Sequence, residues 1–152
     1  MEPLYAWDEE VGTASCVLFY KDKQFVGIAC CHPEDDDMRS ALTGQTIAEM
    51  RATIDYLKYV RDVEIKPQLA ALKQLYFSMK HSKRFNPKSY EAKMLIRHIK
   101  SYEDDLANIK KMIEQERTDL RQYINQKDAM YRLLRSKRYV EGQEALNHND
   151  EN

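Results

Sequence analysis

The apolar positions of residues 92–134 form the longest regular pattern in the chain. They recur at steps of three and four residues, and only Glu116 and Lys127 interrupt the series. This spacing predicts a narrow apolar stripe along one long α-helix, which must be buried against another helix. The stripe, called the seam below, consists of Ala92, Leu95, Ile99, Tyr102, Leu106, Ile109, Ile113, Leu120, Tyr123, Met130 and Leu134.

Capping residues predict where this long helix begins and ends. Asn86 and Pro87 suit a helix start, since asparagine caps the first turn and proline fits within it. The helix is expected to run to about Tyr139, which makes it about 75 Å long at 1.5 Å per residue. Residues 141–152 are expected to form a flexible acidic tail.

A second helical pattern precedes the long helix. Thr46 and Glu49 form a capping box, which predicts a helix start at this point. Pro67 removes a backbone donor, so we expect a kink or brief break before helix resumes towards Met79. The apolar face of the first part comprises Ile47, Met50, Ile54 and Leu57.

The N-terminal part of the chain has the composition of β-strands. Residues 13–20 and 24–31 are rich in β-branched, aromatic and other apolar side chains, and a short connection separates them, which predicts an antiparallel hairpin. Leu4 to Trp7 would add a third, edge strand. Strands of such continuous apolar character need cover on at least one face. We expect the face containing Ile47 and Leu57 to supply that cover.

These elements predict an α+β fold. A ββα head over residues 1–64 is followed by an antiparallel helical hairpin or coiled-coil arm over residues 65–140 and the tail. The long helix exceeds the helical segment before it, about 50 Å long, so a second copy of the chain is the simplest cover for the remainder. We therefore expect a homodimer, the alternative being a frayed end. The oligomerisation residues expected are Ile99, Tyr102, Leu106, Ile109, Ile113, Leu120 and Tyr123.

Charge is distributed unevenly although the net charge is only −1. Residues 1–40 hold nine acidic and three basic side chains, and residues 80–100 hold seven basic and one acidic. Such asymmetry favours oriented electrostatic contact with a partner. The basic segment suits an acidic protein surface or a phosphate backbone. The residues expected to bind either one are Lys80, Lys83, Arg84, Lys88, Lys93 and Arg97.

Candidate catalytic and metal-binding residues are few. His32 and the acidic run 34–37 suggest a Mg²⁺ or Mn²⁺ site, but a solvated loop explains them more simply, because no calcium-loop spacing is present. Cys30 and Cys31 are adjacent, so on a strand they point to opposite faces and do not suit one zinc ion. No phosphate-binding glycine motif occurs. We expect neither enzymatic activity nor a metal or other cofactor.

The apolar runs, the start of the chain and the cysteine count indicate the compartment. No apolar run approaches about 18 residues, so no membrane span is expected. The start of the chain lacks the basic and apolar regions of a signal peptide, and three cysteines do not suit a disulfide framework. A cytoplasmic protein is expected, with a protein partner, and with nucleic acid as an open alternative.

Residues 24–57 carry a resemblance to a known class of protein. An apolar strand with Gly27 leads into His32-Pro33-Glu34-Asp35, then Gly44, Ile47-Ala48 and Arg51-Ala52. This order resembles a hairpin-then-helix unit of small accessory proteins from bacteriophages and prophages of Gram-positive bacteria, and more loosely small proteins like the double-stranded-RNA-binding hairpins. The resemblance implies a protein of the bacterial cytoplasm that binds and blocks a host nucleic-acid enzyme or defence system, as anti-CRISPR proteins do.

Overall fold

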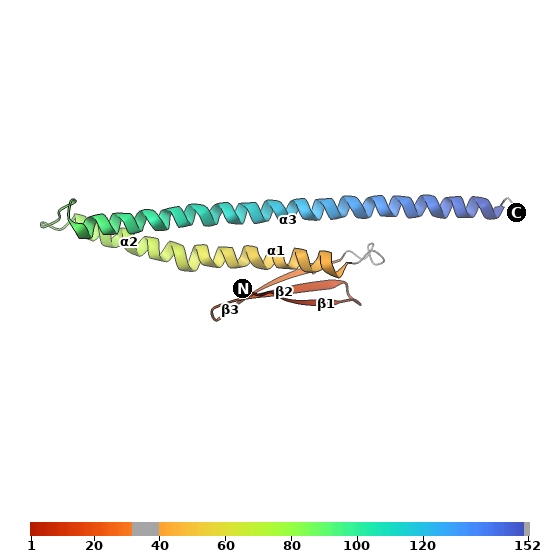
Figure 1. The fold of residues 1–152 in the computed structure, drawn as a ribbon, viewed down its shortest axis with the longest axis horizontal. Coiled ribbons are helices and arrows are strands. Elements are labelled where there is room, and N and C mark those ends of the chain that lie inside the picture. Colours follow the sequence, from red (N-terminus) through yellow and green to blue (C-terminus); the bar gives the residue numbers. More distant parts are fainter. Residues whose placement is uncertain (32–39, 151–152) are drawn as a thin grey trace.

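A computed structural model gives the fold of this chain, and Figure 1 shows its elements. It describes residues 1–31 and 40–150, with side chains to residue 144 and that of Leu146. The fold is α+β, as the sequence predicts, and the sheet has three strands. The elements in chain order are β1 (Leu4–Asp8), β2 (Thr13–Tyr20), β3 (Lys23–Cys30), α1 (Ala41–Tyr59), the π-helical segment η2 (Val60–Ile65), α2 (Lys66–Lys80) and α3 (Tyr90–Asp150).

The molecule is an elongated, layered rod. The antiparallel sheet has the order β1-β2-β3, and α1 covers one of its faces. α1, η2 and α2 form one nearly continuous helical column, and α3 returns beside this column in the opposite direction (Figure 1). α1 therefore lies between the sheet and α3, and it contacts both.

Small residues allow α1 to lie very close to the sheet. Strand alternation turns Cys16 and Gly27 to the inner face, opposite one another in the β2–β3 register. A Cβ atom on Gly27 would lie 1.7 Å from the carbonyl oxygen of Ala48 and 2.7 Å from the amide nitrogen of Ala52. Gly27 is therefore required by close backbone approach rather than by an unusual φ angle. The core cluster at this contact is Cys16, Leu18, Ala29, Ala48 and Ala52.

The apolar face predicted for α1 is divided between two interfaces. Ile47 packs against the core of the sheet, as expected. Leu57 instead packs against Ile109 and Ile113 of α3 and is only 4% exposed, so the expectation that it would cover the sheet is wrong. Ala48 and Ala52 complete the cover where the two backbones approach most closely, because only small side chains fit there.

A charged contact ties the β2–β3 turn to the helical column. Lys21 has φ of 53°, a left-handed conformation that costs a non-glycine residue about 1–2 kcal/mol. Its ammonium group lies 2.5 Å from a Glu64 carboxylate oxygen, and the Tyr20 hydroxyl donates to the other Glu64 oxygen at 3.0 Å. These contacts place the turn against η2 and lower the pKa of Glu64, chiefly through the bond from Lys21.

The π-helical segment lies immediately before the predicted break. The Lys66 amide donates to the carbonyl of Arg61, five residues earlier, and Pro67 occupies the first turn of α2. Proline lacks the amide that would satisfy the Val63 carbonyl in a regular α-helix. The column accommodates this missing donor by widening into η2, so the helix is altered at the predicted place without being broken.

Two helix starts differ from the capping predictions. α1 begins at Ala41, where Ser40 accepts a hydrogen bond from the Thr43 amide, while Thr46 lies inside the helix and donates to the Leu42 carbonyl. α3 begins after Ser89, whose hydroxyl oxygen accepts from the Ala92 amide. Serine side chains thus cap both helices, as serine commonly does.

Two further expectations about the long helix are also corrected. Asn86 does not cap it but accepts the Lys88 amide within the preceding turn. At its other end the helix does not stop near Tyr139, and its backbone continues through Gly142 to Asp150. No proline occurs in this region, and a single glycine is not enough to end the helix.

Gly27→Ala tests the close approach of α1 to the sheet. Because the added methyl group has no space, the substitution should lower the free energy of unfolding by about 3 kcal/mol or more. Gly142→Ala is the matched control, since nothing lies within 4 Å of the added Cβ. That change should stabilise α3 by about 0.5–1 kcal/mol. Urea unfolding followed by circular dichroism measures both, and equal small effects would contradict the packing described.

Ile113→Ala tests the contact between α1 and α3. Ile113 is 1% exposed against Leu57, so its truncation should cost about 2–5 kcal/mol. Met112, the next residue, is 52% exposed, and Met112→Ala should change stability by less than about 0.5 kcal/mol. The same unfolding experiment separates the two, and similar losses would show that α3 does not pack in this orientation.

Candidate interaction surfaces

The basic residues singled out in the sequence gather at one end of the rod. Lys80 ends α2, residues 81–89 form the turn into α3, and all six predicted binding residues are exposed. We call this group the basic tip, and it occupies the end of the rod where α2 meets α3 (Figure 1). Its members are Lys80, Lys83, Arg84, Lys88, Lys93 and Arg97.

Local contacts give the basic tip a defined shape. The amides of Ser82, Phe85 and Ser89 each donate to a carbonyl three residues earlier, at 3.0–3.1 Å. The ring of Phe85 meets Tyr76 of α2 edge-on, with centroids 6.1 Å apart. The turn is therefore held against α2, and its cations extend from a structured base.

Two exposed aromatic side chains flank the basic tip. Phe77 is 63% exposed and lies against His81, with ring centroids 4.2 Å apart, and Tyr90 is 74% exposed. Exposed aromatic rings beside cations can stack on unpaired bases. They can equally insert into the apolar part of a protein interface.

The seam divides into an intrachain part and a less covered part. Ile109 and Ile113 are buried against Leu57 of the same chain, so in this conformation they are not available to a second copy. Ala92 and Leu95 are buried as well. The remaining predicted oligomerisation residues are half-buried, and their role in a dimer stays a prediction: Ile99, Tyr102, Leu106, Leu120 and Tyr123.

The two polar interruptions of the seam have different surroundings. Lys127 is half-buried, and its ammonium lies 5.4 Å from the centroid of the Tyr123 ring, within range of a cation–π interaction. Burial raises the pKa of Glu116, and the negative charges of Asp119 and of Glu49 on α1 raise it further. Glu116 is thus a destabilising group in the intrachain interface.

α3 extends further beyond its partner than the sequence predicted. Asp128 and Tyr131 of α3 lie around the same cavity as Ser40 and Thr43 at the start of α1. Residues 132–150 therefore project past α1, as the blue part of α3 in Figure 1 shows. The signal in the sequence is that no proline and only one glycine follow Leu134. Exposed apolar residues on this stretch include Leu133, Leu134, Val140 and Leu146, next to Met130.

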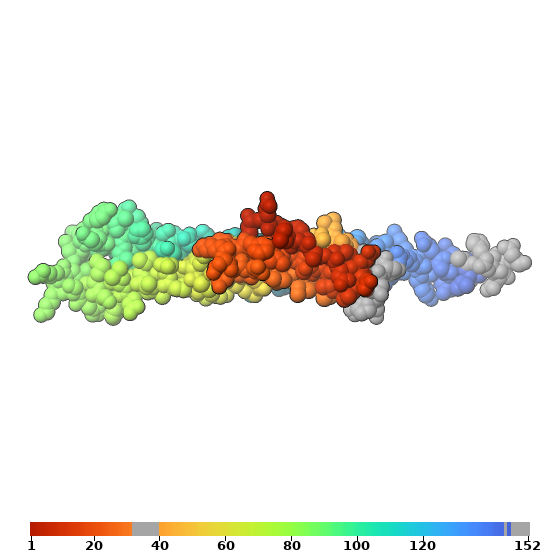
Figure 2. All heavy atoms as spheres, turned by 90° about the horizontal axis from the view of Figure 1, so that it is seen from below, coloured from red at the N-terminus to blue at the C-terminus, as the bar shows by residue number. Residues whose placement is uncertain are grey.

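The outer face of the sheet is also apolar. Val17 lies between Leu4 and Val26 in the register, so the three side chains form a row across the strands. Leu4 is 60% and Val26 48% exposed, and Phe19 and Ile28 are exposed beside them. This face is turned towards the viewer in Figure 2. It is a surface that a partner could cover.

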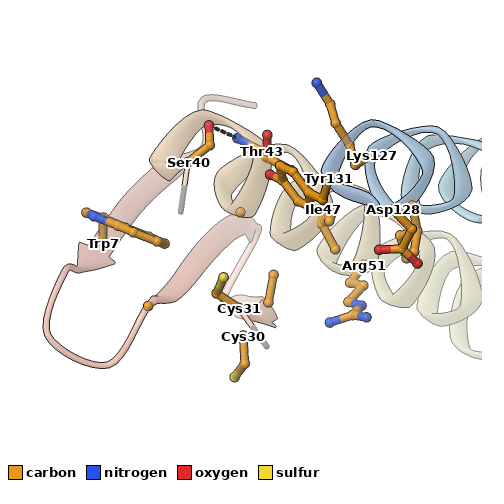
Figure 3. Close-up of a pocket in the computed structure, with 14 residues that line it drawn as sticks. Trp7, Cys30, Cys31, Ser40, Thr43, Ile47, Arg51, Lys127, Asp128 and Tyr131 are labelled. Carbon is orange, nitrogen blue, oxygen red and sulfur yellow. Dashed lines mark hydrogen bonds between the residues drawn. The ribbon is translucent and has the colours of Figure 1, made fainter. Parts of the chain in front are cut away.

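A cavity of about 200 Å³ opens where the sheet, α1 and α3 meet. Trp7, Arg51 and Tyr131 contribute to its wall, and Ser40 lies at its rim with its hydroxyl bonded to the Thr43 amide (Figure 3). Cys31 and Ser40, the residues that flank segment 32–39, both line it. Segment 32–39 is outside the described residues, so we assign the cavity no ligand.

The cysteines do not converge on one site. Cys16 is buried on the inner face of the sheet, where burial raises the pKa of its thiol, whereas Cys30 is exposed and pairs with Thr13. Within residues 1–31 and 40–150, no group of three or more metal-binding side chains comes together. The predicted acidic loop, His32 with residues 34–37, lies outside the described residues.

Comparisons with protein-family models, curated proteins and solved structures found no match to this chain. In the part of the chain that the structure describes, no helix has both the length and the apolar character needed to cross a membrane.

Glu116→Gln tests the charge within the seam. The raised pKa means that the folded state keeps its proton up to a higher pH than the unfolded state, whose glutamate titrates near 4.3. Stability therefore falls as pH rises through the interval between the two pKa values, and the loss persists above it. Glu116→Gln should remove this loss and stabilise the protein at pH 7 by less than about 1 kcal/mol, since solvent screens a half-exposed carboxylate.

The comparison requires urea unfolding at pH 7 and at pH 4. The advantage of the glutamine variant should shrink at the lower pH, where Glu116 is largely protonated. Asp105→Asn, an exposed change on the same helix, is the control for loss of one negative charge. Destabilisation by Glu116→Gln at pH 7 would show that the carboxylate makes a favourable contact.

Proposed function

We propose that this protein is a non-enzymatic interaction protein whose basic tip docks on an acidic surface of a protein partner. The observation that carries the proposal is the concentration of exposed cations on a structured turn at the end of a rod. A projecting tip reaches a recessed acidic site without bringing the acidic N-terminal half of the chain into contact. Complementary charge of this kind accelerates association and orients the two proteins.

The class of partner follows from the resemblance of residues 24–57. Small phage and prophage accessory proteins act on host machinery, and enzymes or defence complexes that handle nucleic acid expose sites shaped for polyanions. Sites for polyanions are basic, so the acidic surface that the basic tip would bind belongs to a regulatory or docking region of such an assembly. We infer a cytoplasmic protein that blocks or modulates a host nucleic-acid enzyme or defence system, in the manner of an anti-CRISPR protein.

Direct nucleic-acid binding is the second candidate. The exposed rings of Phe77 and Tyr90 beside the basic tip favour it, because cations and aromatic rings together bind single strands. The net charge of −1 and the sequence pI of about 6.4 argue against it, since nucleic-acid-binding domains are usually basic overall. We therefore place it second.

Assembly is a further part of the proposal. We propose that the protein is a homodimer and that its helices form a coiled-coil arm extending from the ββα head. Support comes from the half-buried positions of the seam and from the stretch of α3 that extends past α1. In such a dimer each copy presents one basic tip, so binding to a partner with repeated sites would gain from multivalency.

Neutralising the basic tip tests the proposed function. The triple variant Lys83→Gln, Arg84→Gln, Lys88→Gln should lose a partner captured from bacterial lysate by the wild type. With that partner purified, association should slow about tenfold at low salt, because charges at an interface rim act mainly on the on-rate. The control, Lys110→Gln, Lys111→Gln, Arg121→Gln, makes the same charge change on exposed positions of α3.

The same variants separate the two candidates. If the tip binds nucleic acid, the wild type should bind random duplex or single strands below micromolar concentration at about 150 mM salt, and each lost phosphate contact should flatten the logarithmic salt dependence by about 0.7–0.9. Such binding, abolished in the tip variant and kept in the control, would overturn the protein-partner proposal. Equal capture of the protein partner by both triple variants would also overturn it.

A further inference from the structure

α3 carries its seam beyond the end of its intrachain partner. The three-four spacing that includes Met130 and Leu134 continues at Lys137, Glu141 and Glu144. Met130 is 42% and Leu134 38% exposed, whereas Ile109 and Ile113 on the same stripe are buried under α1. The projecting residues 132–150, called the overhang below, are thus continuous with an established helix–helix interface.

The overhang has the composition of a helix that needs a partner. At 1.5 Å per residue it extends about 28 Å past α1. In proteins, tertiary packing supplies most of the stability of a helix. Leu133 at 58% and Val140 at 53% exposure border Leu134 and the charged seam positions, so the stripe that these residues form would remain in solvent in a single copy.

We propose that the overhang of a second copy occupies this stripe, with the two overhangs antiparallel. The inference deepens the proposed homodimer, on which it rests, by naming the residues and the orientation. The second helix would pack on the overhang in the same way that α1 packs on the preceding part of α3. The intrachain helix pair would thereby continue into an interchain pair on the same seam.

The start of α1 limits this pairing. α1 begins opposite Asp128 and Tyr131, so a second helix cannot extend further along the seam than about residue 128.

Charge sets the register within this limit. Centring the pair on residue 139 places Lys137 of each copy opposite Glu141 of the other and Leu134 opposite Glu144, each twice by symmetry. In antiparallel coiled coils opposed seam positions meet directly, so both lysine–glutamate pairs join unlike charges. A parallel pairing would instead oppose lysine to lysine and glutamate to glutamate. Antiparallel pairing is thus favoured.

The resulting dimer would be a long rod. The two α3 N-termini would lie about 150 Å apart, with one basic tip at each end and a sheet on each arm. Small helix–helix interfaces of this kind bury little area, so we expect a reversible dimer that forms on the order of tens of micromolar.

Charge exchange tests the pairing. Lys137→Glu opposes two carboxylates at each of the two pairs, and Glu141→Lys opposes two ammonium groups, so each single change should weaken self-association about tenfold or more. The double variant restores unlike pairs and should return the dissociation constant to near its wild-type value. Lys111→Glu, exposed on the opposite side of α3, controls for net charge. Sedimentation velocity on the full-length protein provides these constants.

Small-angle scattering tests the shape. The wild-type dimer should have a maximum dimension about 1.6 times that of the Leu134→Glu variant, which should be a monomer. The unfolding free energy of the Leu134→Glu variant should equal that of the wild type when both are measured at a concentration where they are monomers. The reason is that Leu134 is outside the intrachain core.

Three results would overturn the pairing. A wild type that stays monomeric at hundreds of micromolar would remove both the pairing and the homodimer, yet leave binding by the basic tip to its own test. A dimer no longer than the monomer would keep the homodimer and reject the overhang interface. Single charge variants that dimerise as well as Lys111→Glu does would reject the register.

Discussion

The contact between Gly27 and the backbone of α1 determines how the rest of the rod is built. Because Gly27 carries no side chain, α1 lies close to the sheet through Ala48 and Ala52, and Leu57 need not face the strands. Leu57 can therefore pack against Ile109 and Ile113. α1 thus serves two interfaces at once. This arrangement lets one central helix join a sheet to a long antiparallel helix.

The sequence predicted the elements better than it predicted their faces. The seam, the strands and the disturbance before Pro67 were all apparent, because periodicity and missing donors are local properties. The partner of each face of α1 was not apparent. The apolar series through Ile54 and Leu57 looked like the cover for the sheet, since alanines count little in a pattern of apolar size. Which face meets the sheet depends on the close backbone approach at Gly27, and that distance is not visible in the sequence.

Helix boundaries failed for a related reason. Thr46 and Asn86 are both good capping residues, but Ser40 and Ser89 cap the helices in the structure. Capping preferences differ by only a few tenths of a kcal/mol between serine, threonine and asparagine. The choice between nearby caps is therefore made by tertiary contacts. The tip residues Lys83, Arg84 and Lys88, in contrast, were found from charge alone, because neither their exposure nor their grouping depends on exact helix ends.

Charged residues in the seam mark the change from intrachain to proposed interchain packing. Burial and the negative charges of Asp119 and of Glu49 on α1 raise the pKa of Glu116, so its cost is borne within one chain. Lys137 and Glu141 lie beyond α1, where their charges are solvated in a single copy. When a second helix packs there, these charges stabilise only the arrangement that opposes unlike charges. An apolar seam across the overhang would bind more tightly but would accept either orientation. The observed sequence exchanges affinity for orientation, which is what a rod needs if its two basic tips are to point in opposite directions.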